Sequence, residues 1–112
     1  MKTADAFKIF KAEASRCIDK AGLKNWDIEV EFRPVENGKA ECPNDCINRY
    51  ASIVMGSNHD WETVGELKRA ARHEVGHIIA AELAFLARAR FATLREIERA
   101  TESMCTLFEK LL

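Results

Sequence analysis

The sequence predicts an α+β domain, because segments with the apolar spacing of helices flank a segment that alternates like a strand. Apolar residues recur every three or four positions near both ends of the chain and around residues 63–88. Apolar and charged residues alternate strictly over residues 26–33. With 112 residues the chain has room for one hydrophobic core, so we expect a single domain over residues 1–112.

The first two elements have clear boundaries. A helix is expected over residues 3–21, with Gly22 as its stop signal. In the next segment, WDIEVEFRP, apolar residues alternate with charged ones until Pro34, which predicts a half-buried strand. The N-terminal helix therefore leads directly into a small sheet.

The rest of the sheet is expected to be antiparallel. The dipeptide Asn37-Gly38 is a strong hairpin signal, because both central residues of such a turn need positive φ. Pro43 and Asn44 interrupt the following segment, so the second clear strand is predicted over residues 48–55. One edge of this small antiparallel sheet is expected to be exposed.

Two helices are expected after the sheet. Thr63 with Glu66 fits a capping box for a helix that runs to about residue 88, with Asp60 as a rival start. Thr93 with Glu96 fits a second capping box, for a helix that continues to the chain end.

Composition disfavours several classes of function. A formal net charge of -1, with basic and acidic residues interleaved, gives no footprint for nucleic acid. Charges break up the N-terminus, so a secretory signal is not expected, and the longest weakly charged run is too short to span a bilayer. We therefore expect a cytoplasmic protein that binds neither nucleic acid nor membrane.

The segment RAARHEVGHIIAAE, residues 69–82, carries the main functional signal. At 100° per residue, Glu74 falls in the middle of the apolar stripe of its helix, with His73 and His77 along the edge. An unpaired carboxylate in a core costs several kcal/mol or becomes protonated, so a helix designed only to pack would place an apolar residue there. A nearby cation or a wet cleft would remove the contradiction.

The spacing suits zinc chemistry. Residues i and i+4 of a helix point the same way, so His73 and His77 can bind one Zn²⁺ at about 2.0–2.1 Å. Glu74 can then reach a water as general base without binding the metal, which is the working unit of a zinc hydrolase. The alternative is a solvated helix with chance histidines. For this composition, an accidental His-Glu-x-x-His has a frequency of about one in a hundred.

A catalytic zinc needs a third protein ligand. No third histidine follows His77, so we expect a carboxylate from the last helix, where Glu98 and Glu102 share one stripe and Glu96 is occupied in its capping box. Either glutamate could bind the metal, while the other accepts a hydrogen bond from the second ring nitrogen of a metal-binding histidine. Helical-wheel geometry slightly favours Glu98, and salt bridging with nearby arginines is the alternative for both.

The four cysteines allow a rival metal site. Cys42 and Cys46 form a Cys-x3-Cys pair, which would need Cys17 and Cys105 to complete a four-cysteine zinc site. In a reducing cytosol, buried small side chains or free thiols are the alternative.

The motif HEVGH, followed by a helical glutamate, resembles that of the gluzincin metallopeptidases. More narrowly, the chain resembles small metallopeptidase-like proteins encoded by phages and prophages, and more distantly the ImmA/IrrE-type zinc peptidases. The similarity spans about residues 48–112. The HExxH motif is specific, and the remainder is similar in pattern only. The resemblance implies a zincin-like fold with His73 and His77 as ligands, Glu74 as general base and Glu102 as the preferred third ligand.

These observations lead to the hypothesis of a minimal zinc metallopeptidase that acts on a peptide or protein substrate, aligned along an exposed edge strand at residues 48–55. Tyr50 and His59 are the spare candidates for a transition-state donor, and a structural role is expected for each. The alternative is a catalytically inactive zincin-like, phage-associated interaction protein with structural metal or none. The sequence leaves the oligomeric state open.

Overall fold

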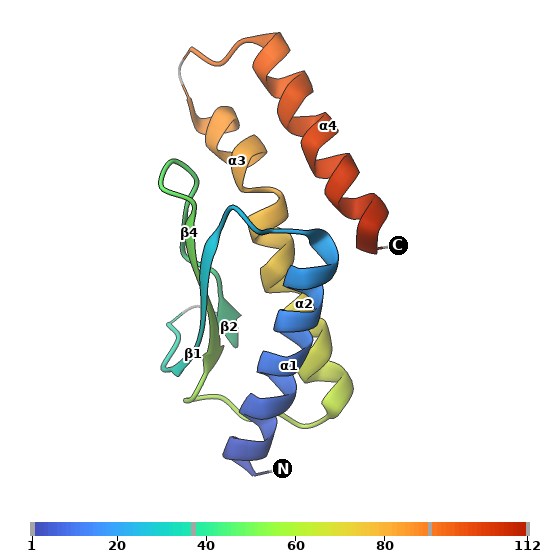
Figure 1. The fold of residues 1–112 in the computed structure, drawn as a ribbon. Coiled ribbons are helices and arrows are strands. Elements are labelled where there is room, and N and C mark those ends of the chain that lie inside the picture. Colours follow the sequence, from blue (N-terminus) through green and yellow to red (C-terminus); the bar gives the residue numbers. More distant parts are fainter. Residues whose placement is uncertain (1, 37, 90, 112) are drawn as a thin grey trace.

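Four helices and a small mixed sheet of four strands form an α+β fold in the computed structural model, which describes residues 2–36, 38–89 and 91–111, without the side chains of residues 110 and 111. Helices α1 and α2 lie against one face of the sheet, and α3 and α4 continue past its end (Figure 1). The predicted fold class is confirmed. No helix in the described part of the chain is both long and apolar enough to span a membrane.

Helix α1, Thr3–Ala21, has the predicted boundaries. Gly22 ends it with φ of 70°, in the left-handed region that glycine adopts without steric cost, and its N–H donates to the carbonyl oxygens of Ile18 and Asp19. The chain is thereby turned toward the sheet at the predicted residue.

The central strand of the sheet is β4, Tyr50–Gly56. Strand β1, Asp27–Arg33, pairs with β4 in parallel along its whole length. The short strands β2, Ala40–Glu41, and β3, Asn44–Asp45, pair with the other side of β4 in antiparallel orientation. The sheet is therefore mixed, and the expectation of an antiparallel sheet with an edge strand at residues 48–55 is wrong. Six of the seven residues of β4 are buried, as suits a strand with a neighbour on each side.

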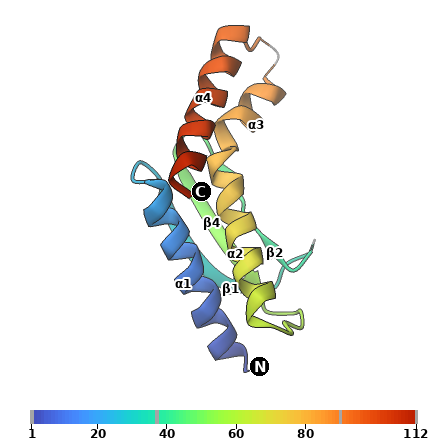
Figure 2. The same cartoon turned by 90° about the vertical axis from the view of Figure 1, so that its right-hand side faces the viewer.

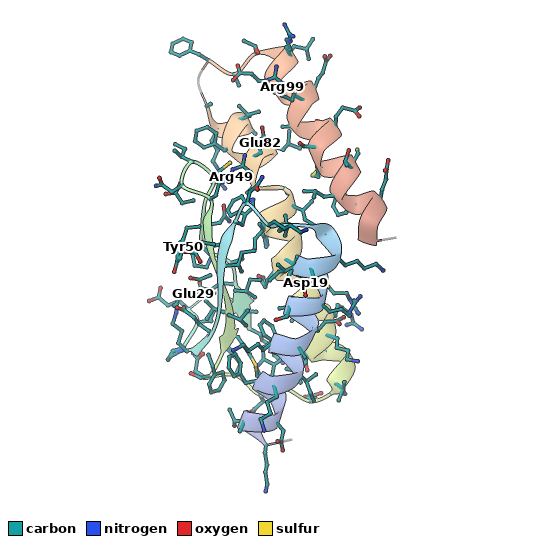
Figure 3. The ribbon with its side chains drawn as sticks, viewed as in Figure 1. Asp19, Glu29, Arg49, Tyr50, Glu82 and Arg99 are labelled. Atoms are coloured by element: carbon teal, nitrogen blue, oxygen red, sulfur yellow. The ribbon has the colours of Figure 1, made fainter. Side chains whose placement is uncertain are left out.

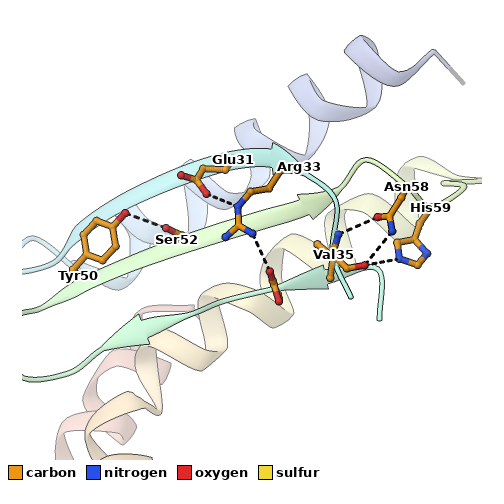
Figure 4. A network of polar contacts seen from close by, with 8 residues as sticks. Glu31, Arg33, Val35, Tyr50, Ser52, Asn58 and His59 are labelled. Carbon is orange, nitrogen blue, oxygen red and sulfur yellow. Dashed lines mark hydrogen bonds and ion pairs between the residues drawn. The ribbon is translucent and has the colours of Figure 1, made fainter. Parts of the chain in front are cut away.

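The predicted hairpin is also wrong, because the chain leaves β1 and crosses to the far side of β4. Asn37 lies outside the described residues, and its neighbours on either side are bound to the segment at the end of β4. Asn58 binds the backbone of Val35 with two hydrogen bonds: the Val35 N–H donates to Asn58 Oδ1 at 3.0 Å, and Asn58 Nδ2 donates to the Val35 oxygen at 3.1 Å (Figure 4). The Gly56 N–H donates to the Lys39 oxygen at 2.8 Å. A Cβ on Gly56 would lie 2.5 Å from that oxygen, so the crossing requires glycine at this position.

Helix α2, Val64–Ile79, begins at Thr63, whose Oγ1 accepts from the Glu66 N–H at 3.1 Å. The single long helix expected to residue 88 is interrupted at Ala80, beyond which α3, Ala81–Arg88, continues. The sequence has neither Gly nor Pro at this point, and the bonds from the Ala80 N–H to Gly76 and from the Ala84 N–H to Ala80 persist. The break is therefore slight.

Helix α4, Leu94–Leu111, starts with the predicted capping box. The Glu96 N–H donates to Thr93 Oγ1 at 3.2 Å, and the Thr93 N–H donates to Glu96 Oε1 at 3.0 Å. Glu96 is thus occupied at the helix start, as expected. Figure 2 shows α4 alongside α3 and the end of α2.

The main core lies between the sheet and the pair α1–α2. Alternate residues of β4 (Ala51, Ile53 and Met55) face these helices and meet Phe10 of α1 and Leu67 of α2. This packing fixes α2 over the sheet, with one flank of the helix beside β2.

Candidate metal centre

Helix α2 carries the histidine–glutamate motif where the helix passes beside the sheet. Glu74 lies on the buried face of the helix, among a set of core side chains that also includes Leu67, Ala71 and Ile78. Its side chain is only 5% exposed, whereas His73 and His77 are exposed. The predicted arrangement, a carboxylate in the apolar stripe with imidazoles along its edge, is confirmed.

The three side chains come close enough to share one ion. A ligand atom from each of His73, Glu74 and His77 lies within 4.8 Å of the others. The two imidazole rings stand 4.9 Å apart between centroids, with planes at 84°. The i, i+4 spacing produces this convergence, because both side chains project from one side of the helix.

Glu74 is the electrostatically unusual member of this group. Within the part of the chain that the structure describes, its Oε2 is the single buried side-chain oxygen or nitrogen without a hydrogen-bond partner. Burial raises the pKa of the Glu74 carboxyl, while His77 and His73 act in the opposite direction. Buried polar groups in native proteins nearly always have a partner, so we expect a water or an ion to contact this oxygen.

The motif opens into a cleft of about 430 Å³ between α2 and the β2 edge of the sheet. Residues from both sides line the cleft: Ala40, Glu41, Cys42, Pro43, His73, Glu74 and His77. The cleft gives solvent a route to the buried carboxylate. Its sheet-side wall was not predicted, because finding it requires the pairing of β2 with β4.

The residues present fit a divalent metal. Two neutral imidazoles on one helical turn are standard zinc ligands, and the orphaned Glu74 oxygen beside them would gain a favourable charge partner. The structure thus brings together three of the predicted site residues.

Cys42 also lines this cleft, although its Sγ does not belong to the group within 4.8 Å. Burial raises the pKa of the Cys42 thiol to about 12, and the Glu74 carboxylate contributes further. Cys42, a member of the alternative four-cysteine site, therefore lies in the cleft of the histidine–glutamate motif.

Glu98 and Glu102 are not brought into the group. Glu102 lines a separate cavity of about 500 Å³, together with Arg49, Glu82 and Arg99, which are labelled in Figure 3. Both glutamates are exposed. Figures 1 and 2 show β2, which bounds the metal cleft, and α4 on opposite sides of α2. The expectation that α4 supplies the third ligand finds no support in this arrangement.

The four cysteines are free and do not gather. Cys17 is buried in the core face of α1, and Cys105 is exposed on α4. No cluster of potential ligands among the described residues includes a cysteine. The arrangement therefore lends no support to a four-cysteine zinc site.

The spare donors lie in the scaffold. The Tyr50 hydroxyl is 3.2 Å from Ser52 Oγ on the sheet face away from the helices, and His59 Nε2 is 3.4 Å from the Val35 oxygen (Figure 4). Neither residue lines the cleft.

Comparisons with protein-family models, curated proteins and solved structures give no match.

Proposed function

We propose that this protein is a metal-dependent hydrolase that cleaves peptide bonds in the cleft beside α2. His73 and His77 hold Zn²⁺, and Glu74 serves as general base. The observation that carries the proposal is the Glu74 oxygen, which is buried without a partner and lies within 4.8 Å of ligand atoms from both imidazoles. Packing alone does not account for a carboxylate at this position.

Zn²⁺ bound there would supply Lewis-acid activation of water and polarisation of the scissile carbonyl. Glu74 takes the proton of the attacking water on its carboxylate and passes it to the leaving amine. Burial raises the pKa of Glu74, which makes its carboxylate a stronger base than an exposed glutamate. Glu74 lies in the middle of α2, on the buried face of the helix, and this placement holds the base in a fixed position.

The walls of the cleft support a peptide as substrate. Strands β2 and β3 form a sheet edge that has no further neighbour among the described strands, so an extended chain can add to it beside the histidines. A second cavity of about 460 Å³ shares His77 and is lined by Ile47 and Phe85. It offers apolar surface for a neighbouring substrate side chain. The predicted role of residues 48–55 as substrate edge passes to residues 40–45.

A non-enzymatic metal site is the second candidate, because Glu74 belongs to the same close group as the histidines. If Glu74 itself binds the ion, no base remains and the metal is structural. Glu74→Gln separates these roles. A base can be replaced without loss of metal, whereas a ligand cannot.

The test is metal content and peptide hydrolysis by wild type, His77→Ala and Glu74→Gln. We expect one zinc in wild type, loss of zinc in His77→Ala, and full zinc without hydrolysis in Glu74→Gln. His59→Ala removes the remaining histidine, which lies outside the cleft, and serves as the matched control. Absence of hydrolysis of a peptide library by zinc-loaded wild type would refute the enzymatic proposal, and hydrolysis by Glu74→Gln at the wild-type rate would refute Glu74 as its base.

A further inference from the structure

The proposed centre has two protein ligands, His73 and His77, and one base, Glu74. Catalytic zinc takes three protein ligands, so one ligand remains to be identified. Besides the histidine–glutamate motif, two residues lining the cleft carry ligand atoms: Glu41 and Cys42. They are adjacent in sequence at the end of β2, and the sheet register distinguishes them.

Glu41 is directed to the outer face of the sheet. It pairs with Val54, the neighbour of the core-facing Met55, and side chains alternate between faces along a strand. Glu41 Oε1 accepts from Arg33 Nη1 at 3.3 Å on that outer face. Its carboxylate thus already has a cationic partner.

Cys42 belongs to the opposite face. Ala40 pairs with Met55 and packs with it against the main core, and Cys42, two residues further on, packs there too. The thiol is half-buried on the α2 side of the sheet, in the cleft that holds Glu74. Glu74, 5% exposed with an unpartnered oxygen, independently marks this cleft as a ligand site.

We propose that Cys42 Sγ is the third protein ligand of the metal held by His73 and His77; this inference rests on the proposed metal site. A thiolate is a strong zinc ligand, and two imidazoles with one thiolate leave a fourth position for water. On binding, the thiol proton passes to solvent and a sulfur–metal bond forms. Glu74 then stays free as base.

Metal binding by Cys42 requires a movement of its side chain. Cys42 Sγ lies outside the 4.8 Å group, so the side chain must turn or its segment must shift toward α2. Strands β2 and β3 have two residues each, and Pro43 between them has no N–H to donate to the ladder. The Pro43 oxygen accepts from the Ser52 N–H at 3.0 Å, so the backbone stays paired with β4 and the movement falls mainly to the Cys42 side chain.

Cobalt substitution provides a readout that is independent of activity. Co²⁺ bound to thiolate gives a charge-transfer absorption band that imidazole and carboxylate ligands do not give. We expect the Co²⁺ form of the 112-residue wild type to show this band, and Cys42→Ser to lose it. The zinc affinity of Cys42→Ser should fall by at least about 100-fold. Residues that only hold the ligands in place contribute up to about 100-fold, and the loss of a direct ligand should cost at least as much.

Cys46→Ser is the matched control, because Cys46 lies four residues further on, in the turn after β3, and lines the neighbouring cavity but not the metal cleft. It should keep the band and the affinity. Glu102→Gln and Glu98→Gln test the competing ligands from α4 and should keep both as well. Circular dichroism of each metal-free variant establishes that the fold is retained.

The outcomes separate the two proposals. If His77→Ala keeps its metal, the proposed site itself is wrong. If His77→Ala loses metal while Cys42→Ser keeps wild-type affinity, or if cobalt wild type lacks the band, Cys42 is not a ligand and only the further inference fails. Loss of affinity in Glu102→Gln alone would return the third ligand to α4.

Discussion

The buried carboxylate of Glu74 and the exposed imidazole of His77 have ligand atoms within 4.8 Å of each other, although their residues face different environments on α2. Glu74 lies where apolar side chains pack, and the imidazole of His77 is exposed to solvent. A metal-free protein keeps Glu74 there at a cost in stability, and several consequences can be measured.

Glu74→Met should increase the stability of the metal-free protein. Methionine has a similar shape, and the substitution removes a buried oxygen that has no partner. We expect the free energy of unfolding in chelator to rise by about 1–3 kcal/mol. Denaturant titration measures it, with exposed Glu98→Met as control. A less stable Glu74→Met protein would show that the carboxylate has a stabilising partner without metal.

Two glycine-to-alanine substitutions should have opposite effects. A Cβ at Gly56 would lie 2.5 Å from the Lys39 oxygen, so Gly56→Ala should destabilise by about 1–3 kcal/mol. A Cβ at Gly76 meets nothing within 4 Å, so Gly76→Ala should stabilise α2 by about 0.8–1 kcal/mol. Thermal and denaturant unfolding of both proteins provide the comparison. A Gly56→Ala protein as stable as wild type would contradict the described crossing at Gly56, and a destabilised Gly76→Ala protein would contradict the open space at Gly76.

An ion cluster between α1 and α2 should make stability depend on acid pH. Glu13, 7% exposed, accepts from Arg16 at 2.7 Å and from Arg72 at 2.9 Å. The hydrogen bond from Arg16 is the main cause that lowers the pKa of Glu13 below its ordinary value of 4.5. A lowered folded-state pKa stabilises the protein above pH 4.5, and this contribution disappears as pH falls through the folded-state pKa.

Glu13→Gln should therefore cost about 1–3 kcal/mol at pH 7 and progressively less below pH 4.5. Unfolding free energies of wild type and variant across pH 3–7, about the range over which carboxylates titrate, test this. A constant difference at all pH values would mean that Glu13 acts through packing rather than charge.

Local patterns predicted most of the helical part of the fold. The boundaries of α1, the caps at Thr63 and Thr93, and the burial of Glu74 all follow from spacing within one segment. These features depend on neighbours a few residues away, which a sequence displays directly.

The sheet could not be predicted in the same way. The hairpin signal at Asn37-Gly38 is local, but the path of this segment depends on Asn58 and on the close approach at Gly56, both about 20 residues downstream. The pairing of β2 with β4 places Cys42 in the metal cleft, and no local pattern contains that register. The sequence favours the carboxylates of α4 as third ligand, because their shared helical stripe is visible in the sequence. Which side of α2 is covered by α4 is a tertiary feature that the sequence does not display.

The most direct test of the central claim is zinc binding by chelator-treated wild type and His77→Ala, measured by calorimetry. The account predicts one tight site in wild type, and affinity at least about 100-fold weaker in His77→Ala, with His59→Ala unchanged. Wild type that binds no zinc, or His77→Ala that binds as tightly as wild type, would contradict it.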